Sequence, residues 1–253
     1  MLSKNIFSKS LSRNFYKKDI NRKISVNIAS YPKRITSLQK SLLNLLNIDI
    51  ISVIRVYLNE YSEVPEILPK DRKIEYKLGP NIKDSGKFYW AKDFKDEIYF
   101  SLDDDLIYSE AFFTQHILLL EKYEGRIFLT THGKIMKEYP KNFTDYTKSF
   151  KCLGTVENNS FINNPGTGVL AFDNSKFIIP IDTFLYHGMA DLCVGLYCQL
   201  NKIPILCRSH SSKELTYLSQ EETLFHKRFD LEKQHSIILK KIDRWEVYKA
   251  WMN

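Results

Sequence analysis

Apolar runs between residues 24 and 207 alternate between the length of a β-strand and the periodicity of a helix. Residues 24–29 (ISVNIA) are apolar and rich in β-branched side chains, which predicts a strand. From Arg34 to Leu46 the apolar residues recur every three or four positions, which predicts a helix. Further strands are expected at residues 52–58, 74–78, 97–102, 126–131, 168–172 and 203–207, and further helices at 109–123 and 189–199. This alternation predicts an α/β fold with a mainly parallel central sheet flanked by helices.

The 253 residues divide into three parts by charge and pattern. The chain is 43% hydrophobic, which is enough for one substantial core, so we expect a single α/β domain over residues 24–215. Residues 1–23 hold seven Lys and Arg residues against one acid, which predicts a basic tail or linker. Such a tail is solvated, packs on a neighbouring domain, or contacts anionic lipid at the inner face of a membrane. Residues 216–253 are expected to form a C-terminal helical extension.

Other features favour a cytoplasmic protein that acts on small molecules. No apolar run is long enough to cross a membrane, and the N-terminal segment lacks the apolar region of a secretory signal. Cys152, Cys193, Cys198 and Cys207 show neither a C-x-x-C pair nor metal-site spacing, so we expect reduced core residues. The net charge of +7 is concentrated in the tail rather than spread over a folded face, which argues against nucleic-acid binding.

Three consecutive aspartates, Asp103, Asp104 and Asp105, directly follow the apolar run at 97–102. Adjacent carboxylates repel each other unless a cation lies nearby, and Mg²⁺ or Mn²⁺ in such a place also binds a diphosphate. A helix N-cap would explain one aspartate but explains three in a row poorly. In doubly wound sheets, ligands bind beyond the carboxyl ends of the strands, where this motif is expected. The sequence therefore predicts a metal-dependent nucleotide site.

An ordered set of short motifs extends over residues 24–212. The motifs are Ile28–Arg34 (IASYPKR), Asp84–Tyr89 (DSGKFY), Asp103–Asp105 with Tyr108, His132-Gly133, Pro165–Gly168 (PGTG), Met189–Asp191 (MAD) and Arg208–His210 (RSH). In this order and spacing the chain resembles the GT-A superfamily of glycosyltransferases, and within it the bacterial enzymes of capsule and lipopolysaccharide synthesis. The resemblance implies that residues 24–215 form one GT-A, or Rossmann-like, catalytic domain.

The resemblance also implies a metal-dependent glycosyltransferase. Its donor would be a nucleotide-diphosphate sugar, most commonly a UDP-sugar, and its acceptor a glycan or glycolipid in surface polysaccharide synthesis. Asp105 corresponds to the metal-binding aspartate of the family's D-x-D motif and would bind Mn²⁺ or Mg²⁺, with His210 completing the metal site. Asp191 corresponds to the catalytic base of inverting members, which takes the proton of the acceptor hydroxyl. Ala190 stands where the family often has a glutamate, and this departure puts the inverting assignment in question.

The other expected site residues fall into two groups. The nucleotide-binding residues are expected to be Ala29, Ser30, Tyr31, Arg34, Asn59, Asp84, Lys87, Asp103 and Asp104. The residues that bind the sugar or the acceptor are expected to be His132, Gly166, Thr167 and Gly168. Simpler explanations also exist: Asp191 could cap a helix, His210 and Lys87 could lie on the surface, and the glycines could form a plain turn. Residues 133–163 are polar and irregular, which predicts a mobile loop that closes over the donor.

Two alternatives belong to other functional classes. A sugar-phosphate nucleotidyltransferase would share a related sheet and an acidic metal site. Such enzymes usually have a glycine-rich phosphate loop after the first strand, and residues 30–34 (SYPKR) contain no glycine. A non-enzymatic, membrane-associated binding module driven by the basic tail would leave the three aspartates unexplained.

Overall fold

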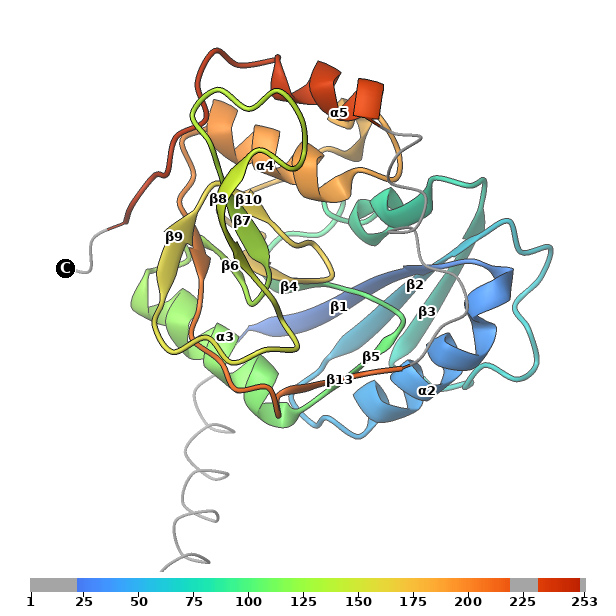
Figure 1. The fold of residues 1–253 in the computed structure, drawn as a ribbon. Coiled ribbons are helices and arrows are strands. Elements are labelled where there is room, and N and C mark those ends of the chain that lie inside the picture. The colour runs from blue at the N-terminus through green and yellow to red at the C-terminus, as the bar shows by residue number, and fades with distance from the viewer. Residues whose placement is uncertain (1–21, 219–231, 251–253) are drawn as a thin grey trace, which may run out of the picture.

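The computed structural model describes residues 22–218 and 232–250, with an eight-stranded sheet at its centre (Figure 1). The strand order is β3-β2-β1-β4-β11-β6-β12-β9. These strands are β1 (Lys23–Ser30), β2 (Val53–Asn59), β3 (Ile74–Gly79), β4 (Glu97–Leu102), β6 (Phe128–Thr130), β9 (Ser160–Ile162), β11 (Val169–Asp173) and β12 (Ile205–Cys207). The predicted strands are all present, with ends shifted by two residues at most. The predicted single-domain α/β fold with a mostly parallel central sheet is confirmed.

The two halves of the sheet differ in strand direction. β3, β2, β1 and β4 are parallel neighbours. β11 runs antiparallel to both of its neighbours, β4 and β6, while β12 is parallel to β6 and β9 forms an antiparallel edge. Since Val169 pairs with Leu102, the start of β11 lies beside the end of β4. This pairing places the turn before β11 next to the three aspartates.

Helices cover both faces of the sheet (Figure 1). α2 (Ile35–Leu46) and α3 (Glu110–Lys122) pack on β1, β2 and β4 in one apolar core. α4 (Ala190–Leu200) packs with parts of β11 and β6 in a second core on the opposite face. Ser109 caps the start of α3, because its hydroxyl accepts a hydrogen bond from the backbone N–H of Phe112 at 3.2 Å. Because both faces are covered, β2 is buried along its whole length.

The prediction of an irregular loop at residues 133–163 is wrong for three short strands within it, β7, β8 and β9. β7 (Gly133–Met136) and β8 (Tyr146–Phe150) form an antiparallel hairpin, and β7 also pairs with β10 (Asn164–Pro165). Four of the five residues of β8 are exposed, so its sequence lacks the apolar alternation that identifies a strand. A further two-stranded sheet joins β5 (Leu106–Tyr108) to β13 (Leu215–Tyr217).

The described C-terminal residues belong to the core of the domain. α5 (Glu232–Leu239) lies beside α4, and residues 240–250 follow it without further helix. Trp245 is 1% exposed and donates from its ring N–H to the carbonyl oxygen of Leu239 at 3.1 Å. Gln199 of α4 exchanges two hydrogen bonds of 2.8 Å with the backbone of Glu246. Within residues 232–250, the predicted helical extension is thus helical only in α5.

The predicted basic tail lies almost entirely outside the described residues. Two residues of the tail are described. Arg22 pairs with Asp173, and Lys23 is the first residue of β1, with its ammonium 3.1 Å from Glu97 Oε1. The part of the predicted extension at residues 219–231 is also outside them. Among the helices of the described ranges, none is long and apolar enough to cross a membrane.

All four cysteines are free thiols. Cys193, Cys198 and Cys207 are buried, as the sequence predicts, and Cys152 is half-buried. Burial raises the pKa of the Cys152 and Cys207 thiols to about 12. These thiols are therefore protonated at neutral pH.

Candidate active site

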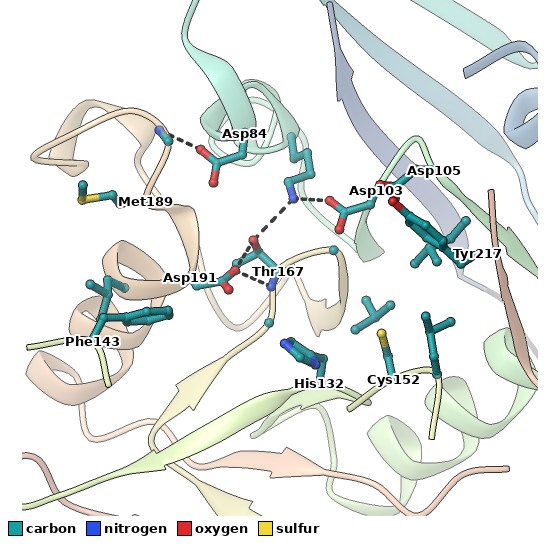
Figure 2. Close-up of a pocket in the computed structure, with 18 of the residues that line it drawn as sticks. Asp84, Asp103, Asp105, His132, Phe143, Cys152, Thr167, Met189, Asp191 and Tyr217 are labelled. Atoms are coloured by element: carbon teal, nitrogen blue, oxygen red, sulfur yellow. Dashed lines mark hydrogen bonds and ion pairs between the residues drawn. The ribbon is translucent and has the colours of Figure 1, made fainter. Parts of the chain in front are cut away.

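A cavity of about 520 Å³ opens where the end of β4 meets the turn before β11 and the start of α4 (Figure 2). Its lining consists of Arg34, Asp84, Lys87, Asp103, Asp105, Leu106, His132, Phe143, Cys152, Leu153, Gly166, Thr167, Gly168, Val169, Gly188, Met189, Asp191, Leu192, Tyr217 and His235. Ten of these residues are predicted site residues. The fold thus brings together most of the motifs that the sequence analysis identified.

The three aspartates have different positions. Asp103 and Asp105 line the cavity, whereas Asp104 is 3% exposed and outside the lining. The guanidinium of Arg34 lies 2.8 Å from Asp104 Oδ1 and also pairs with Asp105. The predicted contact between Asp104 and a nucleotide is therefore not supported. Asp104 instead holds Arg34 at the floor of the site.

The charges around Arg34 strongly affect one another. Burial raises the pKa of Asp104 to about 7, although Arg34 opposes this shift. Burial, and after it the neighbouring Asp103, raises the pKa of Asp105. Burial would lower the pKa of Arg34, but Asp104 and Asp105 together outweigh it and raise the pKa. Negative charge is thus costly to keep at this end of the cavity, which favours the binding of a further cation.

Lys87 occupies the next position along the cavity, at the end of the 3₁₀ helix η2 (Lys83–Phe88). Its ammonium lies 2.8 Å from Asp103 Oδ1 and 3.4 Å from Thr167 Oγ1, and the residue is only 4% exposed. Burial would lower the pKa of Lys87, but Asp103 and Asp84 raise it more. Partial burial would raise the pKa of Asp103, but Lys87 lowers it more, and 46% of the Asp103 side chain stays exposed. The two residues form an ion pair rather than a surface lysine and a free acid.

Asp84 caps α4 from another part of the chain. Its two carboxylate oxygens accept hydrogen bonds from the backbone N–H groups of Gly188 at 2.8 Å and Ala190 at 3.1 Å. Anionic side chains near a helix N-terminus stabilise its unpaired N–H groups. Burial raises the pKa of Asp84. Because both oxygens are used, this geometry supports a positioning role at the start of α4 and not the predicted nucleotide contact.

Asp191 lies in the first turn of α4 and faces the cavity (Figure 2). Its Oδ1 accepts hydrogen bonds from the backbone N–H of Thr167 at 2.8 Å and from the Thr167 hydroxyl at 2.7 Å. No hydrogen bond to its Oδ2 comes from the described residues. The arrangement leaves one carboxylate oxygen for a ligand.

The glycines of the PGTG turn allow close approach at two points. A Cβ at Gly168 would lie 1.8 Å from Asp103 Oδ2, and one at Gly166 would lie 2.4 Å from Cδ2 of His132. The turn is bonded to the end of β4, since the Ser101 hydroxyl donates to the carbonyl oxygen of Thr167 at 2.7 Å. Glycine is therefore needed at both positions to avoid overlap with these protein side chains, whether or not a sugar also binds.

His132 lines the cavity beside this turn. Burial lowers the pKa of His132, so the ring is neutral at pH 7. Its Nδ1 is buried and has no hydrogen-bond partner within residues 22–218 and 232–250. A buried polar atom without a partner is costly, which makes this nitrogen available to a ligand or a water molecule.

Several predicted site residues are not brought to the cavity lining: Ala29, Ser30, Tyr31, Asn59, Asp104 and His210. Asn59 is fully engaged with backbone, because its amide donates to the carbonyl oxygens of Ser30 and Lys83, each at 3.1 Å, and accepts from the N–H of Ile82 at 2.9 Å. It joins the end of β2 to its neighbours and has no bond left for a nucleotide.

The structure does not support His210 as a metal ligand. Its two ring nitrogens lie 2.9 Å from the carbonyl oxygen of Arg208 and 3.2 Å from that of Lys151. Its backbone also forms an isolated bridge with Val156. Both nitrogens thus face protein carbonyl groups, and the buried residue joins two segments of chain.

Other residues of the cavity wall could not be identified as site residues from the sequence. These residues are Leu106, Phe143, Cys152, Leu153, Val169, Gly188, Leu192, Tyr217 and His235. Apolar residues in strands and helices look the same in a sequence whether they face a core or a cavity. Phe143 stacks on His235 of α5, with ring centroids 5.0 Å apart, so the C-terminal segment completes this wall.

The cavity carboxylates fit only one kind of site for a divalent cation. In the part of the chain that the structure describes, no group of three or more His, Cys, Asp or Glu side chains could hold a metal ion. Asp103 and Asp105 lie at the same end of the cavity (Figure 2). Mg²⁺ commonly uses one or two carboxylates together with phosphate oxygens and water. The pair fits an ion shared with a diphosphate and does not fit a site built from protein ligands alone.

Comparison with known proteins supports the fold. No protein-family model and no curated protein matches the chain. Among solved structures, the chain is similar to the 4-diphosphocytidyl-2C-methyl-D-erythritol synthase from Anaerococcus prevotii, with a TM-score of 0.52 and 16% sequence identity. The match covers 83% of this chain and 96% of that chain. At this identity the similarity establishes the α/β fold alone, and the resemblance to capsule and lipopolysaccharide enzymes stays a prediction.

Proposed function

We propose that this chain is a glycosyltransferase that moves a sugar from a nucleotide-diphosphate sugar to a hydroxyl group of a glycan or glycolipid. The observation that supports this proposal is the separation of the cavity carboxylates into two sets. Asp103 and Asp105 lie at the end of β4, while Asp191 faces the same cavity from the start of α4. The first set suits the binding of a diphosphate and its cation, and Asp191 is placed to accept a proton.

Asp103 and Asp105 would hold Mg²⁺ or Mn²⁺ against the diphosphate. When bound, such an ion neutralises the negative charge that develops on the departing nucleoside diphosphate. Arg34 and Lys87 are cations in the same region and add to this stabilisation. Both are held by aspartates, so their positions are set before the donor arrives.

Asp191 would act as the base. In the proposed step, the bond between the anomeric carbon and the diphosphate oxygen breaks as the acceptor oxygen bonds to that carbon. The acceptor proton passes to Asp191 Oδ2, because Oδ1 already accepts two hydrogen bonds from Thr167. The nucleoside diphosphate leaves with the electron pair of the broken bond.

The charge of the lining favours an uncharged acceptor group. Four carboxylates face the cavity, from Asp84, Asp103, Asp105 and Asp191, against the permanent cations Arg34 and Lys87. An acceptor phosphate would add negative charge to this surplus and would be repelled. A sugar hydroxyl would not.

A second candidate is nucleotidyl transfer, in which a sugar phosphate attacks the α-phosphorus of a nucleoside triphosphate and pyrophosphate leaves. The structural similarity to the 4-diphosphocytidyl-2C-methyl-D-erythritol synthase supports this candidate more directly than it supports glycosyl transfer. Two observations argue against this candidate. The cavity has a surplus of carboxylates, and the segment after β1, residues 30–34 (SYPKR), has no glycine-rich phosphate loop.

The location in the cytoplasm and the contact of the basic tail with a membrane stay predictions.

Thermal stability with UDP, with and without Mn²⁺, tests the nucleotide site first. A ligand at 100 times its Kd stabilises the folded state by about 2.7 kcal/mol, which raises the Tm by several degrees. We expect a Mn²⁺-dependent rise in the wild type and its loss in Asp105→Asn. Asp182→Asn is the control, because Asp182 pairs with Lys92 at an exposed surface. An unchanged response of Asp105→Asn would contradict the proposal.

Product analysis then separates the two reactions. A panel of nucleotide sugars with glycan acceptors should release nucleoside diphosphate, and Asp191→Asn should abolish this release while keeping the response to UDP and Mn²⁺. Release of pyrophosphate from a nucleoside triphosphate and a sugar phosphate, without glycosyl transfer, would establish the second candidate instead.

A further inference from the structure

Thr167 makes an unusual pair of contacts with Asp191. Its backbone N–H and its hydroxyl donate to the same oxygen, Oδ1, at 2.8 Å and 2.7 Å (Figure 2). Hydrogen bonds to an ionised acceptor are stronger than those between neutral groups. The carboxylate is therefore fixed in rotation by two donors of one residue.

Lys87 sets the direction of the Thr167 hydroxyl. The Lys87 ammonium lies 3.4 Å from Thr167 Oγ1, and an ammonium group donates hydrogen bonds but accepts none. The hydroxyl oxygen must therefore accept from Lys87, and its hydrogen is left for Asp191. Since Lys87 also pairs with Asp103 at 2.8 Å, Thr167 stands between the two sets of carboxylates.

Thr167 itself is held rigidly and is 1% exposed. Its carbonyl oxygen accepts from the Ser101 hydroxyl at 2.7 Å. On either side, the N–H of Gly166 donates to the carbonyl oxygen of His132 at 2.8 Å, and the carbonyl oxygen of Gly168 accepts from the N–H of Asp103 at 3.0 Å. The turn thus links the end of β4 to the start of α4 through hydrogen bonds.

We propose that Thr167 is a positioning residue that fixes the carboxylate of Asp191, so that only Oδ2 is presented to the acceptor. This inference rests on the proposed function, and it changes the role of Thr167 from the predicted sugar contact to a contact with the base. A residue that bound the sugar would use its hydroxyl for the ligand, whereas this hydroxyl is already engaged on both sides.

Two variants separate the hydroxyl from the shape of the side chain. Thr167→Ser keeps both donors, and Thr167→Val keeps the branched shape and the backbone N–H but removes the hydroxyl. A displacement of about 1 Å in a reacting group can cost about 10²-fold in rate. We expect kcat to fall about 10²-fold in Thr167→Val, with the donor KM and the response to UDP and Mn²⁺ unchanged. Thr167→Ser is expected to restore most of kcat.

Three kinetic results would overturn the inference. They are an unchanged kcat in Thr167→Val, an equal loss in Thr167→Ser, and a raised donor KM with kcat unchanged, which would indicate direct substrate contact.

Crystal structures of both variants test the positioning role without any activity. The Asp191 carboxylate is expected to rotate in Thr167→Val and to stay in place in Thr167→Ser. A carboxylate that keeps its position in Thr167→Val would overturn the inference. If the wild type transfers no sugar at all, the proposed function fails, and these structures still decide whether Thr167 positions Asp191.

Discussion

Replacing Gly168 with alanine would move the Asp103 carboxylate by adding a single methyl group. The new Cβ would lie 1.8 Å from Asp103 Oδ2 and 2.3 Å from its Cγ, and contacts under 3.0 Å are essentially never seen. Gly168 is not among the described glycines with positive φ, so its backbone accepts alanine without strain. The carboxylate must therefore shift by roughly 1 Å or more away from the turn.

The shift has two measurable consequences. Overpacking of this kind costs about 1–3 kcal/mol, and each kcal/mol lowers the Tm of a domain of this size by about 2–4 °C. We therefore expect a fall in Tm of about 2–12 °C. Movement of Asp103 also disturbs its ion pair with Lys87 at 2.8 Å and the carboxylate pair proposed to hold the cation. Transfer activity is expected to fall about 10²-fold.

Differential scanning fluorimetry with UDP and Mn²⁺, together with a transfer assay, measures both effects. Gly154→Ala is the matched control, because the nearest atoms to its new Cβ lie at 3.4 Å and 3.9 Å. That variant should keep the wild-type Tm and activity. If Gly168→Ala kept full activity and an unchanged response to UDP and Mn²⁺, the position of Asp103 would not matter and the proposed cation site would be wrong.

Two further predictions concern stability. Burial raises the pKa of Asp104 from 3.8 to about 7, so the folded protein keeps a proton that the unfolded chain releases near pH 4. The contribution of this group to the free energy of unfolding therefore falls as pH rises from about 4 to 7. Urea titrations should show a flatter pH dependence for Asp104→Asn, and an unchanged one would refute the shift. Trp245→Ala should cost about 3–5 kcal/mol in the same titrations; a loss under about 1 kcal/mol would show that residues 240–250 are dispensable to the core.

The fold followed largely from local pattern. The run ISVNIA at β1, the helical spacing of α2 and the apolar strand before Asp103 each reflect burial of a face, which imposes a period of two or of 3.6 on the sequence. Strands exposed along much of their length, such as β8, carry no such period and were missed.

The sequence by itself determined which residue types would gather at the strand ends, because the three aspartates and the PGTG turn each border an apolar run. Only the tertiary structure decided their roles. Asp84 became a helix cap, Asn59 a backbone bridge and His210 a link between two segments, since each found partners far away in the chain. Hydrogen-bond partners depend on distances in space, and a linear sequence does not contain those distances.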